Sequence, residues 1–190
     1  LKIRQLLLRM RIDKMKIIIA THNKHKLAEM ARILEPMGYE VVTDTDLGFT
    51  LTEAEENGST FLENARIKAE AGCRESGLPC IADDSGLCVD ALGGAPGVFS
   101  ARYSGVHGDD DGNNRKLLKE LDGVPTEKRT AHFACAICVS FPDGSEVTAT
   151  GKCEGYIGYE KKGSNGFGYD PLFMVGDRSL AEMTAEEKDA

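Results

Sequence analysis

The segment MKIIIATHNKHKLAEMARIL, residues 15–34, decides the fold class of this 190-residue chain. It begins with a short apolar run, three isoleucines at 17–19, of the kind found in buried strands. A polar connection follows, and apolar residues then recur at helical spacing from Leu27 to Leu34. A strand that leads through a short loop into a helix is the basic unit of α/β proteins.

The residues after this segment continue the alternation of strands and helices. We expect a strand at 39–43, a helix at 61–76 and a third strand at 80–82 that ends at Asp83-Asp84-Ser85-Gly86. The helix opens with a capping box formed by Thr60 and Glu63. The later elements are one more helix, a long hairpin and a last strand, at 115–121, 129–141 with 146–154, and 172–175. The pattern predicts an α/β domain built around a mixed β-sheet.

The composition excludes several classes of protein. Apolar residues make up 41% and charged residues 28% of the chain, which is ordinary for a globular domain. No apolar run approaches the roughly 18 residues that a membrane-spanning helix needs, so we expect no membrane partner. The net charge of −8 argues against a nucleic-acid-binding surface. A small polyanion is still a possible ligand, because it needs only a few local cations.

Six cysteines occur without a secretory signal, which favours reduced thiols and a cytoplasmic location. Cys135 and Cys138 lie three residues apart in a predicted strand. We expect their side chains on opposite faces, where they cannot share a metal ion.

The first fourteen residues differ from the rest of the chain. Residues 1–14 are basic, and their apolar run at 6–8 is too short for the core of a signal peptide. We predict a leader outside the working protein, with a single domain from Met15 to the end. A transit peptide or a membrane-surface helix is the alternative.

A first polar stretch, Thr21 to Lys26, lies between the first strand and the first helix. The N–H groups at a helix N-terminus attract anions, so Thr21, Asn23 and Lys26 are candidate phosphate-binding residues. Lys26 opposes the helix dipole, which favours a bound phosphate over a purely stabilising role. An ordinary solvated helix start is the alternative.

A second stretch is the pair Asp83-Asp84 at the expected end of the third strand. Neighbouring carboxylates raise each other's pKa unless a cation lies between them. Mg²⁺ commonly takes one or two carboxylates together with substrate phosphates, and Glu56 in the preceding loop could supply another oxygen. A simple turn is an equally good interpretation, because Asp, Ser and Gly form turns.

A third stretch, Asn165 to Pro171, surrounds aromatic residues with glycines. A planar ring could stack on Phe167 or Tyr169, and Asp170 could accept a hydrogen bond from a base. The alternative is a tight loop whose aromatic side chains pack in the core.

Four blocks of sequence, in order, carry a family resemblance: ATHNKHK, ENGSTFLENARIKA, IADDSGLCVDALGGAPGVFSARYSG and NGFGYDPLF. Together they closely resemble the inosine triphosphate pyrophosphatase family. The resemblance implies hydrolysis of noncanonical purine nucleoside triphosphates (ITP, dITP and XTP) to the monophosphate and pyrophosphate, with Mg²⁺ as cofactor. It also implies a cytoplasmic homodimer and an elongated, two-lobed domain around a long mixed sheet, with the active site in a cleft between the lobes.

The resemblance assigns roles to individual residues. Glu56 and Asp84 are the implied metal-binding carboxylates, joined by Asp83 from the carboxylate pair, and Asp84 is the implied catalytic proton acceptor. The implied substrate-binding residues are Thr21, Asn23, Lys26 and Lys68 for the phosphates, Phe167, Gly168, Tyr169, Asp170 and Lys188 for the base, and Ser85.

The family continues beyond the Glu-Glu-Lys at 186–188 with a Ser-His-Arg segment and a last helix, so we expect the C-terminal end of the domain to be missing. Three other functions stay open. They are a nucleotide-binding sensor without catalysis, a phosphatase that releases inorganic phosphate, and a related Maf-type pyrophosphatase with another base preference.

Overall fold

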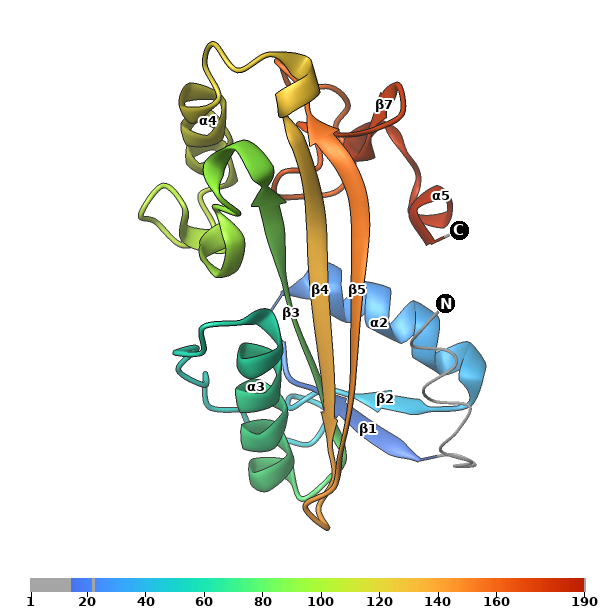
Figure 1. The fold of residues 1–190 in the computed structure, drawn as a ribbon. Coiled ribbons are helices and arrows are strands. Elements are labelled where there is room, and N and C mark those ends of the chain that lie inside the picture. Colours follow the sequence, from blue (N-terminus) through green and yellow to red (C-terminus); the bar gives the residue numbers. More distant parts are fainter. Residues whose placement is uncertain (1–14, 22, 190) are drawn as a thin grey trace. The chain divides into compact units, whose positions relative to one another are not determined.

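The computed structural model describes residues 15–21 and 23–189, which form two compact units (Figure 1). The first unit runs to Asp84 and adds Cys135–Gly151, and the second contains Ser85–Ala134 and the residues from Lys152 onward. The leader predicted at residues 1–14 lies outside the described residues. No described helix is long and apolar enough to cross a bilayer.

Seven strands form one sheet in the order β2-β1-β3-β4-β5-β6-β7. Their bounds are Lys16–Ile19 for β1, Glu40–Val42 for β2, Cys80–Val89 for β3, Thr130–Ser140 for β4, Glu146–Ile157 for β5, Phe173–Val175 for β6 and Arg178–Ser179 for β7. Strand β1 pairs in parallel with β2 and β3, whereas β6 pairs antiparallel with β5 and β7. The predicted α/β fold with a mixed sheet is confirmed.

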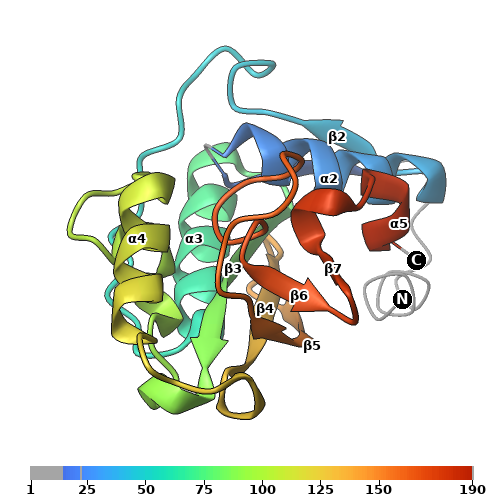
Figure 2. The same ribbon diagram turned by 90° about the horizontal axis from the view of Figure 1, so that it is seen from above.

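Two helices cover opposite faces of the sheet in the first unit (Figures 1 and 2). Helix α2 (Lys24–Leu34) packs Met30 and Leu34 on one face, against Ile17 and its neighbours. Helix α3 (Phe61–Ser76) packs on the other face, where Cys73 clusters with Ile18. Adjacent isoleucines of β1 thus serve two separate clusters, because successive side chains of a strand alternate between faces.

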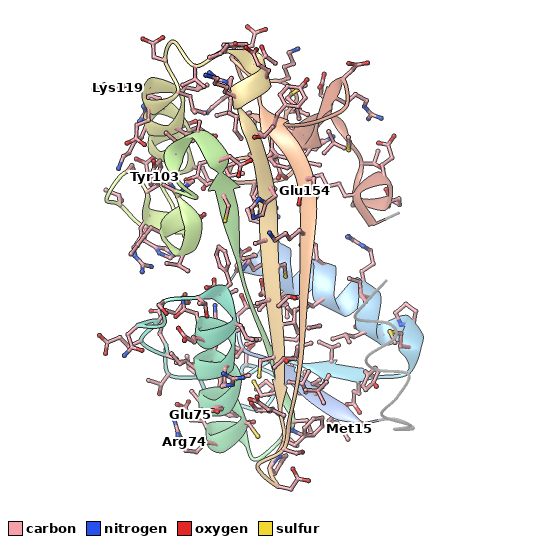
Figure 3. The ribbon with its side chains drawn as sticks, in the orientation of Figure 1. Met15, Arg74, Glu75, Tyr103, Lys119 and Glu154 are labelled. Atoms are coloured by element: carbon pink, nitrogen blue, oxygen red, sulfur yellow. The ribbon has the colours of Figure 1, made fainter. Side chains whose placement is uncertain are left out.

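Helix α3 begins and ends where the sequence predicts. The Thr60 hydroxyl accepts the Glu63 N–H at 3.1 Å, and the Glu63 carboxylate accepts the Thr60 N–H at 3.1 Å. Arg74 and Glu75, labelled in Figure 3, are exposed residues of its last turn. Gly77 ends the helix with a φ of +68°, a conformation that favours glycine.

The second unit has a core of its own, in which Leu117 and Leu121 pack with Leu87 of β3 and Phe173 of β6. Helix α4 (Asp110–Glu120) begins five residues earlier than predicted. The Asp109 side chain accepts the Gly112 N–H at 2.9 Å, so Asp109 caps a helix whose first turn is acidic. Helix α5 (Ala185–Asp189) is a single short turn.

Strand β3 corrects the sequence analysis. The predicted strand ends at Ala82, but β3 continues to Val89 and takes Asp83 and Asp84 into its interior. The turn preference of Asp-Ser-Gly is overridden because β3 lies between β1 and β4, and its backbone is part of that sheet. The two carboxylates therefore point to opposite faces instead of meeting in a turn.

The cysteines agree with the sequence analysis. All six are free thiols. Cys135 packs with the cluster under α2, and Cys138 with the alanines of α3, so they occupy opposite faces as predicted.

Candidate functional site

On the α3 face of β3, Asp84 meets two donors from one helix. Lys68 Nζ lies 3.8 Å from Asp84 Oδ1, and Asn64 Nδ2 donates to Asp84 Oδ2 at 3.0 Å. The same ammonium lies 3.1 Å from Glu56 Oε1, so it joins the two carboxylates. Burial raises the pKa of Asp84, and Lys68 and Asn64 only partly oppose this. A buried carboxylate with a raised pKa is suited to accept a proton.

On the α2 face, Asp83 has a lysine of its own. Lys26 Nζ lies 2.7 Å from Asp83 Oδ2, and the side chains are only 19% and 7% exposed. Burial by itself would lower the pKa of Lys26, but the Asp83 carboxylate outweighs it and the pKa is raised. Lys26 is thus held as an ammonium ion at the start of α2.

Two of the predicted phosphate-side residues, Thr21 and Asn23, shape the N-terminus of α2 through their side chains. Asn23 Oδ1 accepts the N–H groups of His25 at 2.9 Å and Lys26 at 3.3 Å. Thr21 Oγ1 accepts the N–H of Asn23 at 3.2 Å. Asn23 is therefore the N-cap of the helix, and Lys26 in the first turn carries a buried ammonium at this end.

The carboxylates of Glu56 and Asp84 fit Mg²⁺ by their chemistry. Both approach the ammonium of Lys68, so they lie close to one point where a positive charge stabilises them. The charge of Glu56 raises the pKa of Asp84, as expected for two like charges near each other. Two hard oxygen ligands leave the remaining positions for phosphate and water, the pattern usual for Mg²⁺.

The other predicted metal ligand, Asp83, is paired with Lys26, whose charge also acts on Asp84. Within residues 15–21 and 23–189, no cluster of three or more His, Cys, Asp or Glu side chains is arranged as a metal site.

In the second unit, Asp170 is the centre of the predicted base side. Its Oδ2 accepts Lys188 Nζ at 2.7 Å and the N–H of Phe167 at 3.3 Å. Gly166 lies so close that an added Cβ would stand 1.9 Å from Asp170 Oδ2, and its φ is +80°. Only glycine fits there, which ties the glycine-rich sequence to the position of this carboxylate.

The aromatic residues of this segment differ in exposure. Phe167 is half-buried, whereas Tyr169 is 4% exposed and packs in the core with Leu172. The Tyr169 hydroxyl donates to the Ser100 carbonyl at 2.9 Å. Of the two rings, Phe167 is the more exposed, and Tyr169 packs in the core.

Gly168 is held by α4 through both of its peptide groups. Its N–H donates to Asp110 Oδ2 at 2.8 Å, and its carbonyl accepts Asn114 Nδ2 at 2.8 Å. Ser85, the remaining predicted substrate contact, follows Asp84 in β3 and is half-buried.

Sequence reasoning missed the two asparagines Asn64 and Asn114. Each is 1% exposed although each lies within a helix, where asparagine has a poor propensity. That mismatch is the signal that could have found them. Asn64 also precedes Lys68 by four residues, which places both on one helix face.

Comparisons with known proteins show the family of this chain. Residues 17–190 match the model of the Ham1 family. The dITP/XTP pyrophosphatase of Bacillus subtilis (strain 168) is 52% identical over 174 residues, which cover 90% of this chain and 87% of the relative. The dITP/XTP pyrophosphatase of Haemophilus influenzae is 50% identical over 179 residues, which cover 92% of this chain and 91% of the relative.

Solved structures show the same likeness. The nucleoside-triphosphatase / dITP/XTP pyrophosphatase of Mycobacterium abscessus matches with a TM-score of 0.77 and 48% identity, over 92% of each chain. The HAM1 protein of Coxiella burnetii matches with a TM-score of 0.83 and 40% identity, over 92% of this chain and 90% of that one. Sequence and fold thus agree, and this chain belongs to the Ham1 family.

Proposed function

We propose that this chain hydrolyses noncanonical purine nucleoside triphosphates, ITP, dITP and XTP, to the monophosphate and pyrophosphate. The observation that carries the proposal is the arrangement of Glu56, Lys68 and Asp84, a cation between two carboxylates at a buried strand. The relatives named dITP/XTP pyrophosphatase support the substrate class.

The lysines and the carboxylates have different roles at the phosphates. Lys26 and Lys68 bind the triphosphate and offset its charge. Asp84 accepts a proton from the water that attacks the α-phosphorus. The bond from that phosphorus to the bridging oxygen breaks, and pyrophosphate leaves. Glu56 and Asp84 would hold Mg²⁺, which supplies positive charge at the phosphate oxygens.

The base side supports a 6-oxopurine. Such a base carries a hydrogen on N1, which the Asp170 carboxylate can accept, whereas adenine has none there. Lys188 and the Phe167 N–H hold this carboxylate in place. A polar site left without its partner rejects the wrong base strongly, so Asp170 would favour ITP over ATP.

The cofactor, a homodimeric state and a cytoplasmic location belong to the same proposal. The free thiols of all six cysteines are consistent with a reducing compartment. Light scattering of the purified chain tests the oligomeric state.

A panel of ITP, dITP, XTP, GTP and ATP with Mg²⁺, analysed for products, tests the activity. Monophosphate and pyrophosphate from the first three nucleotides are the expected result. Binding without any product would indicate a sensor, and inorganic phosphate would indicate a phosphatase. Strong preference for another base would favour a Maf-type activity.

A further inference from the structure

The side-chain amide of Asn64 is oriented unambiguously by its two partners. The backbone N–H of Gly58 can only donate, and it points to Asn64 Oδ1 at 2.8 Å. The amide nitrogen must therefore face the other partner, Asp84 Oδ2, at 3.0 Å. Asn64 is 1% exposed, so water does not compete for these bonds.

Asn64 donates a hydrogen bond to one oxygen of Asp84, and the Lys68 ammonium lies 3.8 Å from the other oxygen. They lie four residues apart on α3 and so share a face of the helix. Asn64 contacts Oδ2, and Lys68 lies nearer Oδ1. The amide thereby sets the rotation of the carboxylate and turns Oδ1 toward the cation that Glu56 also contacts.

The other end of the amide holds the loop that carries Glu56. Gly58 comes two residues after Glu56, and an added Cβ on Gly58 would stand 2.6 Å from Asn64 Oδ1. On the far side of Glu56, the Thr52 N–H donates to Glu75 Oε2 at 2.8 Å. Helix α3 thus anchors the loop on both sides of this glutamate.

We infer that Asn64 is a positioning residue that couples Glu56 to Asp84, fixing one through the loop backbone and the other through its carboxylate. The inference rests on the proposed function, because those two carboxylates are its metal-binding and proton-accepting groups. Asn64 acts through its bonds to the Gly58 N–H and the Asp84 carboxylate.

Four variants separate the two contacts of Asn64. Asn64→Asp keeps an acceptor for the Gly58 N–H and loses the donor to Asp84. Gly58→Ala leaves the Asn64 side chain unchanged but crowds Asn64 Oδ1 and the start of α3, so it strains the loop contact. Asn64→Leu removes both bonds at similar volume. Asn57→Asp is the matched control, because it makes the same charge change at an exposed position of the same loop.

We expect Asn64→Asp and Asn64→Leu to lower kcat for ITP about 100-fold, as small displacements of catalytic groups do. KM should change much less, because Lys26 and the base-side residues are untouched. Gly58→Ala should also lower kcat, and Asn57→Asp should leave it within about twofold of the wild type. Thermal unfolding of all four variants identifies any variant that does not fold. If Asn64→Leu does not fold, the kcat of Asn64→Asp decides the result, because aspartate has nearly the same shape as asparagine.

Two measurements on the free protein do not depend on turnover. The amide-proton chemical shift of Gly58 should change in Asn64→Leu and persist in Asn64→Asp. Titration with Mg²⁺ alone should show weaker binding in Asn64→Leu than in Asn57→Asp. If folded Asn64→Asp and Asn64→Leu keep the wild-type kcat, the inference is wrong. If the wild type makes no pyrophosphate, the proposed function is wrong. In that case the inference is tested by Mg²⁺ titration alone, and it is wrong if Asn64→Leu binds Mg²⁺ as the wild type does.

Discussion

Two lysine–carboxylate pairs, one in each unit, have the same geometry on very different scaffolds. Lys26 and Asp83 are joined at 2.7 Å, and so are Lys188 and Asp170. The side chains of both pairs are largely buried. The first pair joins an eleven-residue helix to the interior of a ten-residue strand. The second joins a five-residue helix to a turn.

The difference shows how each pair is held. Regular backbone hydrogen bonds place Lys26 and Asp83, so many contacts must fail together before this pair moves. Lys188 depends on a single helical turn, which Glu187 ties to Arg178 and Thr184 by its side chain. The unit proposed to bind phosphates is thus built on rigid elements, and the base side on a few side-chain contacts. The predictions below test that division.

Chelation should have the largest effect on activity. Excess chelator should abolish ITP hydrolysis, because the single ammonium of Lys68 cannot offset two carboxylates and a triphosphate without a divalent cation. Mg²⁺ should restore turnover better than Ca²⁺, which prefers more ligands at longer distances. Pyrophosphate release measured against metal concentration checks this, and full turnover in excess chelator would remove the metal from the proposal.

Asp84→Asn should lower kcat by about 10²- to 10⁴-fold, the usual cost of losing a general base. The loss should be equal for ITP and ATP, because the substitution lies on the phosphate side. Far-UV circular dichroism should show an unchanged fold. A rate near that of the wild type would exclude Asp84 as the proton acceptor and make Asp83 the next candidate.

Asp170→Asn addresses the other unit. It weakens a hydrogen bond to a charged acceptor, so kcat/KM for ITP should fall about 10- to 100-fold. ATP hydrolysis and the Mg²⁺ concentration for half-maximal rate should stay unchanged. Equal losses for ITP and ATP would place Asp170 outside base recognition.

Lys26→Met should lower kcat/KM about tenfold, with the same factor for ITP and ATP, as expected for loss of one charge-assisted contact to phosphate. Because the substitution leaves the Asp83 carboxylate buried without its lysine, it should also lower Tm. The double variant Lys26→Met with Asp83→Asn should recover Tm but not activity. A selective effect on one base would contradict the assignment of Lys26 to the phosphates.

Local patterns in the sequence predicted much of this fold, and distant contacts account for the errors. The isoleucines of β1 and the capping box of α3 are recognisable within a few residues. The length of β3 is not, because it depends on β4, whose residues lie about fifty positions later. Asp83-Asp84 therefore resembled a turn.

The same limit applies to the candidate site. The sequence pattern indicated Lys26 and Asp84, and the resemblance added Lys68, but each was predicted as a separate residue. Lys26 and Asp83 are 57 positions apart, so no spacing rule predicts their ion pair. The sequence did not predict a role for Asn64, because that role depends on contacts with both Gly58 and Asp84 in the folded chain.

The smallest predicted effect concerns the support of Lys188. Glu187 accepts hydrogen bonds from Arg178 at 2.9 and 3.1 Å and from the Thr184 N–H at 2.8 Å, and these lower its pKa from 4.5 to about 2. The depressed pKa means that the ionised contact stabilises α5 fully above about pH 4.5 and is lost as the pH falls toward 2.

At neutral pH only substitution can remove this contact, and Glu187→Gln should loosen α5 and with it Lys188. Since the pair is exposed, we expect KM for ITP to rise about two- to fivefold, with kcat and the Mg²⁺ requirement unchanged. Glu186→Gln, which removes an acidic charge one residue away, is the control. If Glu187→Gln lowered kcat as much as Lys26→Met does, the short helix α5 would support the phosphate chemistry as well as base binding. That result would contradict the assignment of phosphate binding to one unit and base binding to the other.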